Sequence, residues 1–144
     1  MNTTKLLFIA ISVLTATVLS AACGSATTDG TAGKTFATGP AGNNLTATLT
    51  SADGSLRKGK QEFTLTFTDS SGKPVDVGSV ALNYRMAAMG SMAEMNNGAA
   101  FKTTGTPGVY RGSVDIEMTG EWQAQITYEG PAGKGAFSLP VRAK

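Results

Sequence analysis

Apolar and polar residues alternate along the chain from Leu45 onward. An alternation of period two predicts strands with one buried face. It recurs in about seven short runs separated by turns rich in Gly, Pro and Ser, which favours an all-β, immunoglobulin-like antiparallel β-sandwich. The predicted strand positions are Leu45, Ala47 and Leu49; Phe63, Leu65 and Phe67; Val80, Leu82, Tyr84 and Met86; a weaker run over 99–103; Tyr110, Gly112, Val114, Ile116 and Met118; Trp122, Ala124, Ile126 and Tyr128; and Phe137, Leu139 and Val141.

The order of these strands predicts that three unlike loops lie at one end of the sandwich. In an antiparallel succession, the loops after the first, third and fifth strands share an end. They are a basic loop at 53–59, a methionine-rich loop at 87–97 and a corner at 118–120. The basic side chains Arg57, Lys58 and Lys60 are expected to face solvent, where they could contact lipid headgroups or an acidic partner.

Residues 1–22 have the pattern of a secretory leader. A charged start ending at Lys5 precedes an apolar run over 6–19, and small residues over 20–22 come just before Cys23. The apolar run is shorter than the roughly 20 residues that a bilayer span requires, which favours a cleaved signal. The small residues followed by Cys23 resemble the lipobox of bacterial lipoproteins, whose cysteine is acylated and becomes the new N-terminus. The alternative is a secreted protein with a free thiol, although an unpaired cysteine is unusual in an oxidising compartment.

The chain is therefore expected to have three parts. Residues 1–22 form the leader, residues 23–43 form the acylated cysteine with a flexible tether of small polar residues, and residues 44–144 form the folded domain. The composition, 41% hydrophobic and 15% charged, fits a globular domain. A formal charge of +2, with Lys and Arg spread evenly, argues against nucleic-acid binding.

Four methionines recur at every third position within ten residues, which singles this stretch out as a candidate soft-metal site. Thioether sulfur is soft and uncharged, so it favours Cu(I) or Ag(I) over harder ions. A step of three residues would spread the methionines around an α-helix, and the Gly and Ser in the middle disfavour a helix, so an irregular loop is expected. The predicted ligands are Met86, Met89, Met92, Met95 and, from the neighbouring corner, Met118; Met89 and Met92 are the foremost, and Met86 is the most structural.

Two other roles remain open for these methionines. They could cap the end of the sandwich or dock a partner, because methionine packs adaptably, or they could act as an oxidant sink through sulfoxide formation. Trp122 is expected in the core, from where its ring could still lie against a bound cation as a neighbour of the ligands. Glu94 is expected to be a solvated loop charge.

Several motifs resemble those of the YtkA-like domains, which are related to FixH-like proteins. They are the stretches over 72–75, 86–92, 108–110 and 118–122, which read GKPV, MAAMGSM, GVY and MTGEW, within a similarity that covers 45–141. The resemblance implies a small extracytoplasmic β-sandwich associated with copper handling, copper efflux or oxidase assembly. It also implies that Met86, Met89, Met92 and Met118 match the family's methionines. This chain departs from its relatives by having Ala87 where Met-Pro is common, and by lacking histidine.

A binding protein is expected rather than an enzyme. The chain has no histidine, which removes Ser-His and Cys-His catalysis, and no paired carboxylates or activated nucleophile can be assembled from the predicted loops. The prediction is an envelope lipoprotein, anchored in the membrane through Cys23, that binds Cu(I) and serves a copper efflux or oxidase-assembly partner. The rival hypothesis is a metal-free envelope module that docks a partner through its methionine surface. If the envelope has two membranes, the residue after Cys23, Gly24, slightly favours the outer one by resemblance to lipoprotein sorting.

Overall fold

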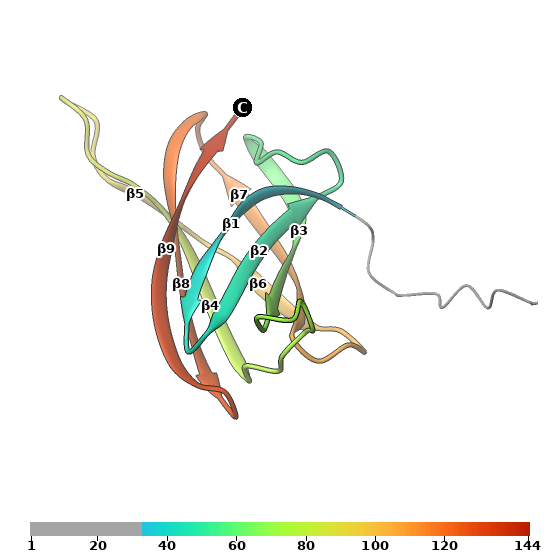
Figure 1. Ribbon diagram of the computed structural model, residues 1–144. Coiled ribbons are helices and arrows are strands. Elements are labelled where there is room, and N and C mark those ends of the chain that lie inside the picture. Colours follow the sequence, from blue (N-terminus) through green and yellow to red (C-terminus); the bar gives the residue numbers. More distant parts are fainter. Residues whose placement is uncertain (1–32) are drawn as a thin grey trace, which may run out of the picture.

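The computed structural model describes residues 33–144 and consists of nine β-strands in two antiparallel sheets (Figure 1). Cys23, the leader and residues 24–32 lie outside the described residues. The first sheet has the order β1-β2-β3-β7-β6 and the second β5-β4-β8-β9. The strands are β1 Lys34–Gly42, β2 Leu45–Ser51, β3 Gly59–Thr68, β4 Ser79–Met86, β5 Met95–Gly98, β6 Ala100–Thr103, β7 Val109–Ile116, β8 Gly120–Gly130 and β9 Gly133–Ala143. The predicted all-β sandwich is confirmed.

The core lies between the two sheets and is built from the alternating positions of their strands. Along β2, for example, Leu45, Ala47 and Leu49 are buried while the residues between them are partly or fully exposed. Trp122 and Tyr84 are the largest fully buried side chains. Aromatic rings from both sheets meet edge to face across the core, which is a favoured geometry for such pairs.

One strand was not expected from the sequence. Residues 34–42, predicted to belong to a flexible tether, form β1 along the edge of the first sheet, so that part of the prediction is wrong and the folded domain begins about ten residues before residue 44. Small side chains make this strand possible, since a Cβ on Gly39 would lie 2.5 Å from Leu139 Cδ2 on β9. Phe36 is the one large apolar side chain of β1 and packs partly buried against the core, so the strand is held mainly by its ladder to β2 and its close approach to β9.

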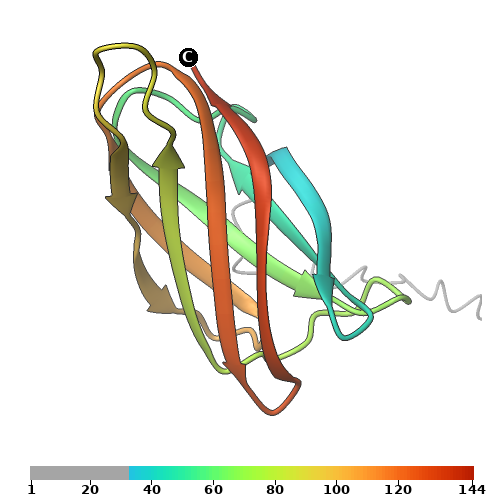
Figure 2. The same cartoon turned by 90° about the vertical axis from the view of Figure 1, so that its left-hand side faces the viewer.

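The second unexpected strand is β5. The predicted weak run over 99–103 corresponds to β6, but the residues before it also pair, and they pair with β4 in the other sheet. The switch falls at Ala99, whose backbone N–H donates to Leu82 O at 2.9 Å. One continuous segment thus closes this flank of the sandwich (Figure 2). The strands β1 and β5, added to the seven predicted runs, make the nine strands of the fold.

The predicted gathering of three loops at one end is confirmed. Loops 52–58, 87–94 and 117–119 follow β2, β4 and β7, and Figure 2 shows them at the upper end beside the C-terminal strand. The pairs Gly59 with Ile116 and Gly120 with Ala143 fix this end. We call it the methionine pole. The structure contains, within residues 33–144, no helix long and apolar enough to cross a bilayer.

Candidate metal centre at the methionine hairpin

The four clustered methionines lie on one β-hairpin, which we call the methionine hairpin and define as residues 86–95. Met86 pairs with Met95 where β4 and β5 begin to separate, and Met89 pairs with Met92 at the tip. The expected irregular loop is therefore wrong: the methionines form two cross-strand pairs in one register. Figure 1 shows the hairpin leaning away from the body of the sandwich.

The tip is a two-residue turn made by Gly90 and Ser91. Met89 N–H donates to Met92 O at 3.1 Å, and Met92 N–H donates to Met89 O at 2.9 Å. Gly90 has a φ of 55°, while Ser91 stays at negative φ, as in a type II′ turn, whose twist matches that of the flanking strands. The turn thus holds the two methionines opposite each other.

This outer pair, Met89 and Met92, presents two thioethers to solvent. Their side chains are 54% and 37% exposed, and within residues 33–144 they are the exposed large hydrophobic residues. Directly opposed residues on an antiparallel pair project from the same face with Cβ atoms about 5 Å apart. Two sulfur atoms on flexible side chains can therefore converge on a single ion at the tip.

The inner pair, Met86 and Met95, is directed into the protein instead. Met86 is 3% exposed, and Met95 is half-buried against the core. Side chains alternate between faces at every residue of a strand, so a step of three moves successive methionines to opposite faces. The two pairs are also about 10 Å apart along the strand, since each residue advances by about 3.4 Å. The structure does not bring all four sulfurs together.

The remaining predicted residues belong to the packed end of the sandwich. Trp122 is 1% exposed, which confirms its placement in the core, and its Nε1–H donates to Met118 O at 3.1 Å. Met118 is half-buried against the core. A Cβ on Gly120 would lie 2.9 Å from Met86 Cε, so the Met86 side chain fills the space over this glycine. Met86, Met118 and Trp122 close the methionine pole from within.

An ion pair stabilises the base of the hairpin. Arg85 Nη2 lies 2.5 Å from Glu94 Oε2, and Asn96 Nδ2–H donates to Glu94 Oε1 at 3.0 Å. The hydrogen bond from Arg85, with a further one from Asn96, lowers the pKa of Glu94 to about 2, and the same pair raises the pKa of Arg85. Glu94 is therefore exposed in the loop, as expected from the sequence, and is in addition the ion-pair partner of Arg85.

The basic loop is ordered by one carboxylate. Asp53 accepts hydrogen bonds from Ser51, Ser55 and Arg57, and chiefly the Ser55 hydroxyl lowers the pKa of Asp53 to about 2. Arg57 nevertheless stays mostly exposed, as expected. The loop is also tied to the C-terminal strand, because Lys58 N–H donates to Lys144 O at 3.1 Å.

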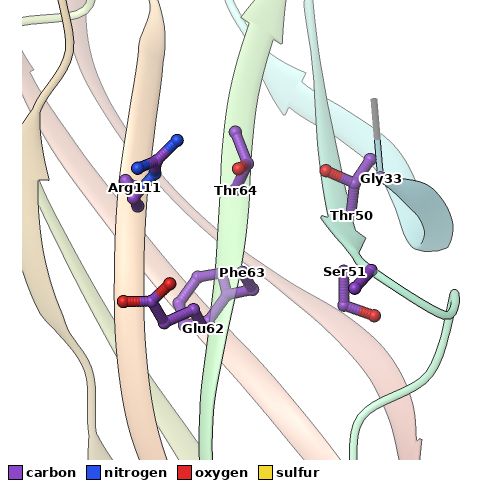
Figure 3. A pocket seen from close by; sticks show the side chains of 8 residues that line it. Gly33, Thr50, Ser51, Glu62, Phe63, Thr64 and Arg111 are labelled. Carbon is purple, nitrogen blue, oxygen red and sulfur yellow. The ribbon is translucent and has the colours of Figure 1, made fainter. Parts of the chain in front are cut away.

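The donors that this pole offers to a metal are thioethers. Within residues 33–144, no group of three or more His, Cys, Asp or Glu side chains is arranged to hold a metal ion. A hollow of about 140 Å³ lies elsewhere, on the outer face of the first sheet between β2, β3 and β7 (Figure 3). Glu62, Thr64 and Arg111 line it, and no sequence pattern pointed to it. Its oxygen and guanidinium groups are not soft-metal ligands.

The geometry defines a class of protein: an antiparallel β-sandwich that presents a pair of thioethers on a projecting hairpin. A comparison with protein-family models matches the YtkA-like family over residues 41–127. Since the match covers more than half of the 144 residues, the chain belongs to the YtkA-like family. The match contains the whole methionine hairpin and stops within β8, before the end expected at residue 141. No curated protein matches the chain.

Proposed function

We propose that this chain is an extracytoplasmic lipoprotein, acylated at Cys23, that binds Cu(I) through its methionine hairpin in copper chaperoning, efflux or tolerance. The observation that carries the proposal is the outer pair: Met89 and Met92 lie opposite each other, fixed by two mutual backbone hydrogen bonds, and both are exposed. A packing role alone gives no reason to leave two large apolar side chains in water at a projecting tip.

The chemistry of the donors fits Cu(I), and also Ag(I). Thioethers are soft ligands, and they carry no proton that a metal must displace. The nearest carboxylate on the hairpin, Glu94, is already engaged by Arg85 and Asn96, so it does not compete to attract hard cations. Unlike cysteine, methionine does not form disulfides, which suits an oxidising compartment.

The ligand roles follow from burial. Met89 and Met92 are the ligands, whereas Met95 lies on the opposite face, about 10 Å further along the strand, and packs half-buried against the core. Met86 and Met118 serve the core, because Met86 fills the space over Gly120 and Met118 packs half-buried against the core. A pair of thioethers at a tip is open on its outer side, which suits passing the ion to an efflux or oxidase-assembly partner.

A titration of the purified chain with Cu(I) under anaerobic conditions, in competition with a chromophoric chelator of modest affinity, tests this proposal. Leucine replaces methionine with similar volume and no sulfur, so Met89→Leu and Met92→Leu should each weaken binding without harming the fold. Loss of a residue that supports a metal ligand typically lowers metal affinity about 10- to 100-fold, so loss of a ligand itself should lower the Cu(I) affinity by more than this. The buried Met86→Leu variant is the matched control and should bind like the parent chain.

The alternative function is docking of an envelope partner without metal. It is supported by the neighbours of the outer pair, because Ala87, Ala88 and Ala93 are also exposed and make the tip apolar. The leucine variants separate the two functions, since leucine preserves an apolar docking surface and abolishes a thioether site. If the parent chain takes no Cu(I) from the chelator, the result would favour the docking function.

A further inference from the structure

The methionine pole is also the end at which the described chain begins. Lys34 opens β1 opposite Ser51, the last residue of β2, and a Cβ on Gly54 would lie 2.8 Å from Lys34 Cβ. The chain that leads from Cys23 therefore enters the sandwich beside the basic loop. Figure 2 shows the start of β1 toward the same end as the hairpin tip and the C-terminal strand.

The number of residues between Cys23 and the sandwich limits how far an anchor at Cys23 can lie from the methionine pole. Eleven residue steps separate Cys23 from Lys34. Even a fully extended chain of this length reaches only about 40 Å, at no more than about 3.6 Å per residue. The 11-residue strand β8 alone is about 37 Å long at about 3.4 Å per residue. An anchor at Cys23 thus favours the orientation in which the methionine pole, rather than the opposite end, is near the membrane.

The surface of this pole fits a bilayer with anionic lipids. Lys34, Lys58 and Lys144 are exposed around the basic loop, and none of them belongs to the ion pairs found in residues 33–144; the exposed Glu117, in the loop after β7, also belongs to none of these pairs, so the lysines outnumber it three to one. Clustered lysines attract anionic headgroups. The hairpin beyond its base carries no charge between residues 86 and 93, and its largest exposed side chains are Met89 and Met92. Basic and apolar groups on one surface are what a membrane interface accommodates.

We infer that the methionine pole rests on the anionic bilayer that holds the Cys23 anchor, with the tip of the methionine hairpin at the headgroup level and the three lysines over the lipid phosphates. The inference rests on the lipid anchor in the proposed function but not on copper. It places the thioether pair against the membrane surface, where the ion would be exchanged with a membrane-embedded partner rather than with one in the aqueous space.

The test compares two probes on the lipidated full chain in vesicles containing phosphatidylglycerol, without copper. Ser91 at the hairpin tip and Ser70 at the opposite end are both exposed turn serines, so Ser91→Cys and Ser70→Cys form a matched pair. Acylation blocks Cys23, which leaves one thiol in each variant for an environment-sensitive dye. The Ser91 dye should shift to the blue and be quenched by nitroxide-labelled lipid, whereas the Ser70 dye should keep its emission in water.

The inference would be overturned by equal exposure of both dyes to water or by shielding of the Ser70 dye. Shielding of the Ser91 dye only after membrane proteins are added would also overturn it, because that result would assign the surface to a protein partner. An intact mass without added lipid at Cys23 would overturn it as well. Replacing Lys34, Lys58 and Lys144 by Glu should reduce the quenching of the Ser91 dye. Because no copper is present, failure here leaves Cu(I) binding untouched, and failure of the Cu(I) titration leaves this orientation intact.

Discussion

The turn at Gly90 should determine how well the outer methionine pair is prepared for an ion. Gly90 has a φ of 55° and no atom within 4 Å of the position a Cβ would take, so Gly90→Ala introduces backbone strain without any steric clash. A left-handed conformation costs an L-residue about 1–2 kcal/mol. The strain should open the tip and separate Met89 from Met92 while both sulfur atoms remain in the chain.

If the whole strain of about 1–2 kcal/mol reduces the free energy of metal binding, the Cu(I) affinity of Gly90→Ala falls by about 5- to 30-fold, since 1.4 kcal/mol corresponds to a factor of ten. Gly90→Asn is the matched control, because asparagine is one of the residues that type II′ turns accept, and it should retain most of the affinity. The chelator competition assay measures both variants. Amide hydrogen exchange at Met92, whose N–H donates to Met89 O, reports the opening of the tip independently.

The refuting result is specific. If Gly90→Ala exchanges its Met92 amide faster than the parent chain and still binds Cu(I) with unchanged affinity, the ion does not depend on the paired arrangement. The midpoint of thermal unfolding should stay nearly the same in both variants, because the tip projects from the sandwich and adds little to its core. A large drop in that midpoint would show that the hairpin tip is part of the cooperative fold.

Three further predictions follow from burial and charge. Mild hydrogen peroxide should convert Met89 and Met92 to sulfoxides well before Met86, because their exposed fractions are 54% and 37% against 3% for Met86. Peptide mass spectrometry measures the oxidation of each methionine, and uniform oxidation would contradict the assigned burial. Tyr84→Phe should stabilise the domain by about 1–3 kcal/mol in chemical denaturation, since the buried Tyr84 hydroxyl has no hydrogen-bond partner within residues 33–144; a destabilised variant would reveal such a partner. Cu(I) affinity should be constant from pH 5 to 8, since thioethers bind no proton and Glu94, with its pKa lowered to about 2, stays ionised throughout. The ion pair of Glu94 supports the hairpin fully above the ordinary pKa of 4.5, and this support is lost as the pH falls toward 2. A Cu(I) affinity that changes between pH 5 and 8 would point to other ligands.

The sandwich could be predicted because its large apolar residues alternate cleanly. The seven predicted runs all became strands, and the alternation along β8 placed Trp122 in the core. The strand β1 could not be found in this way, because Gly39 and its small neighbours pack through their closeness to β9 rather than through side-chain size. Composition alone does not distinguish such a strand from a flexible tether.

The sequence of the hairpin contains a second signal besides the spacing of its methionines. The methionines are arranged symmetrically about Gly90-Ser91, at one and four residues to either side, and Gly-Ser between two extended runs is a recognised two-residue hairpin sequence. On a strand, a spacing of three residues places successive side chains on opposite faces, whereas on a helix it spreads them around the axis. The symmetry predicts two pairs, and the phase with β4 predicts that Met86 belongs to the inner one. The ion pair between Arg85 and Glu94 needed the register itself, which the sequence does not determine.

Binding of Cu(I) by the exposed thioethers of Met89 and Met92 is the property on which the proposed function depends. Its most direct test is the anaerobic chelator competition on the purified parent chain, the Met89→Leu, Met92→Leu double variant and the Met86→Leu control. The parent chain and Met86→Leu should each bind one Cu(I), and the double variant should hold none against the chelator. Unchanged binding in the double variant, or no binding in the parent, would contradict it.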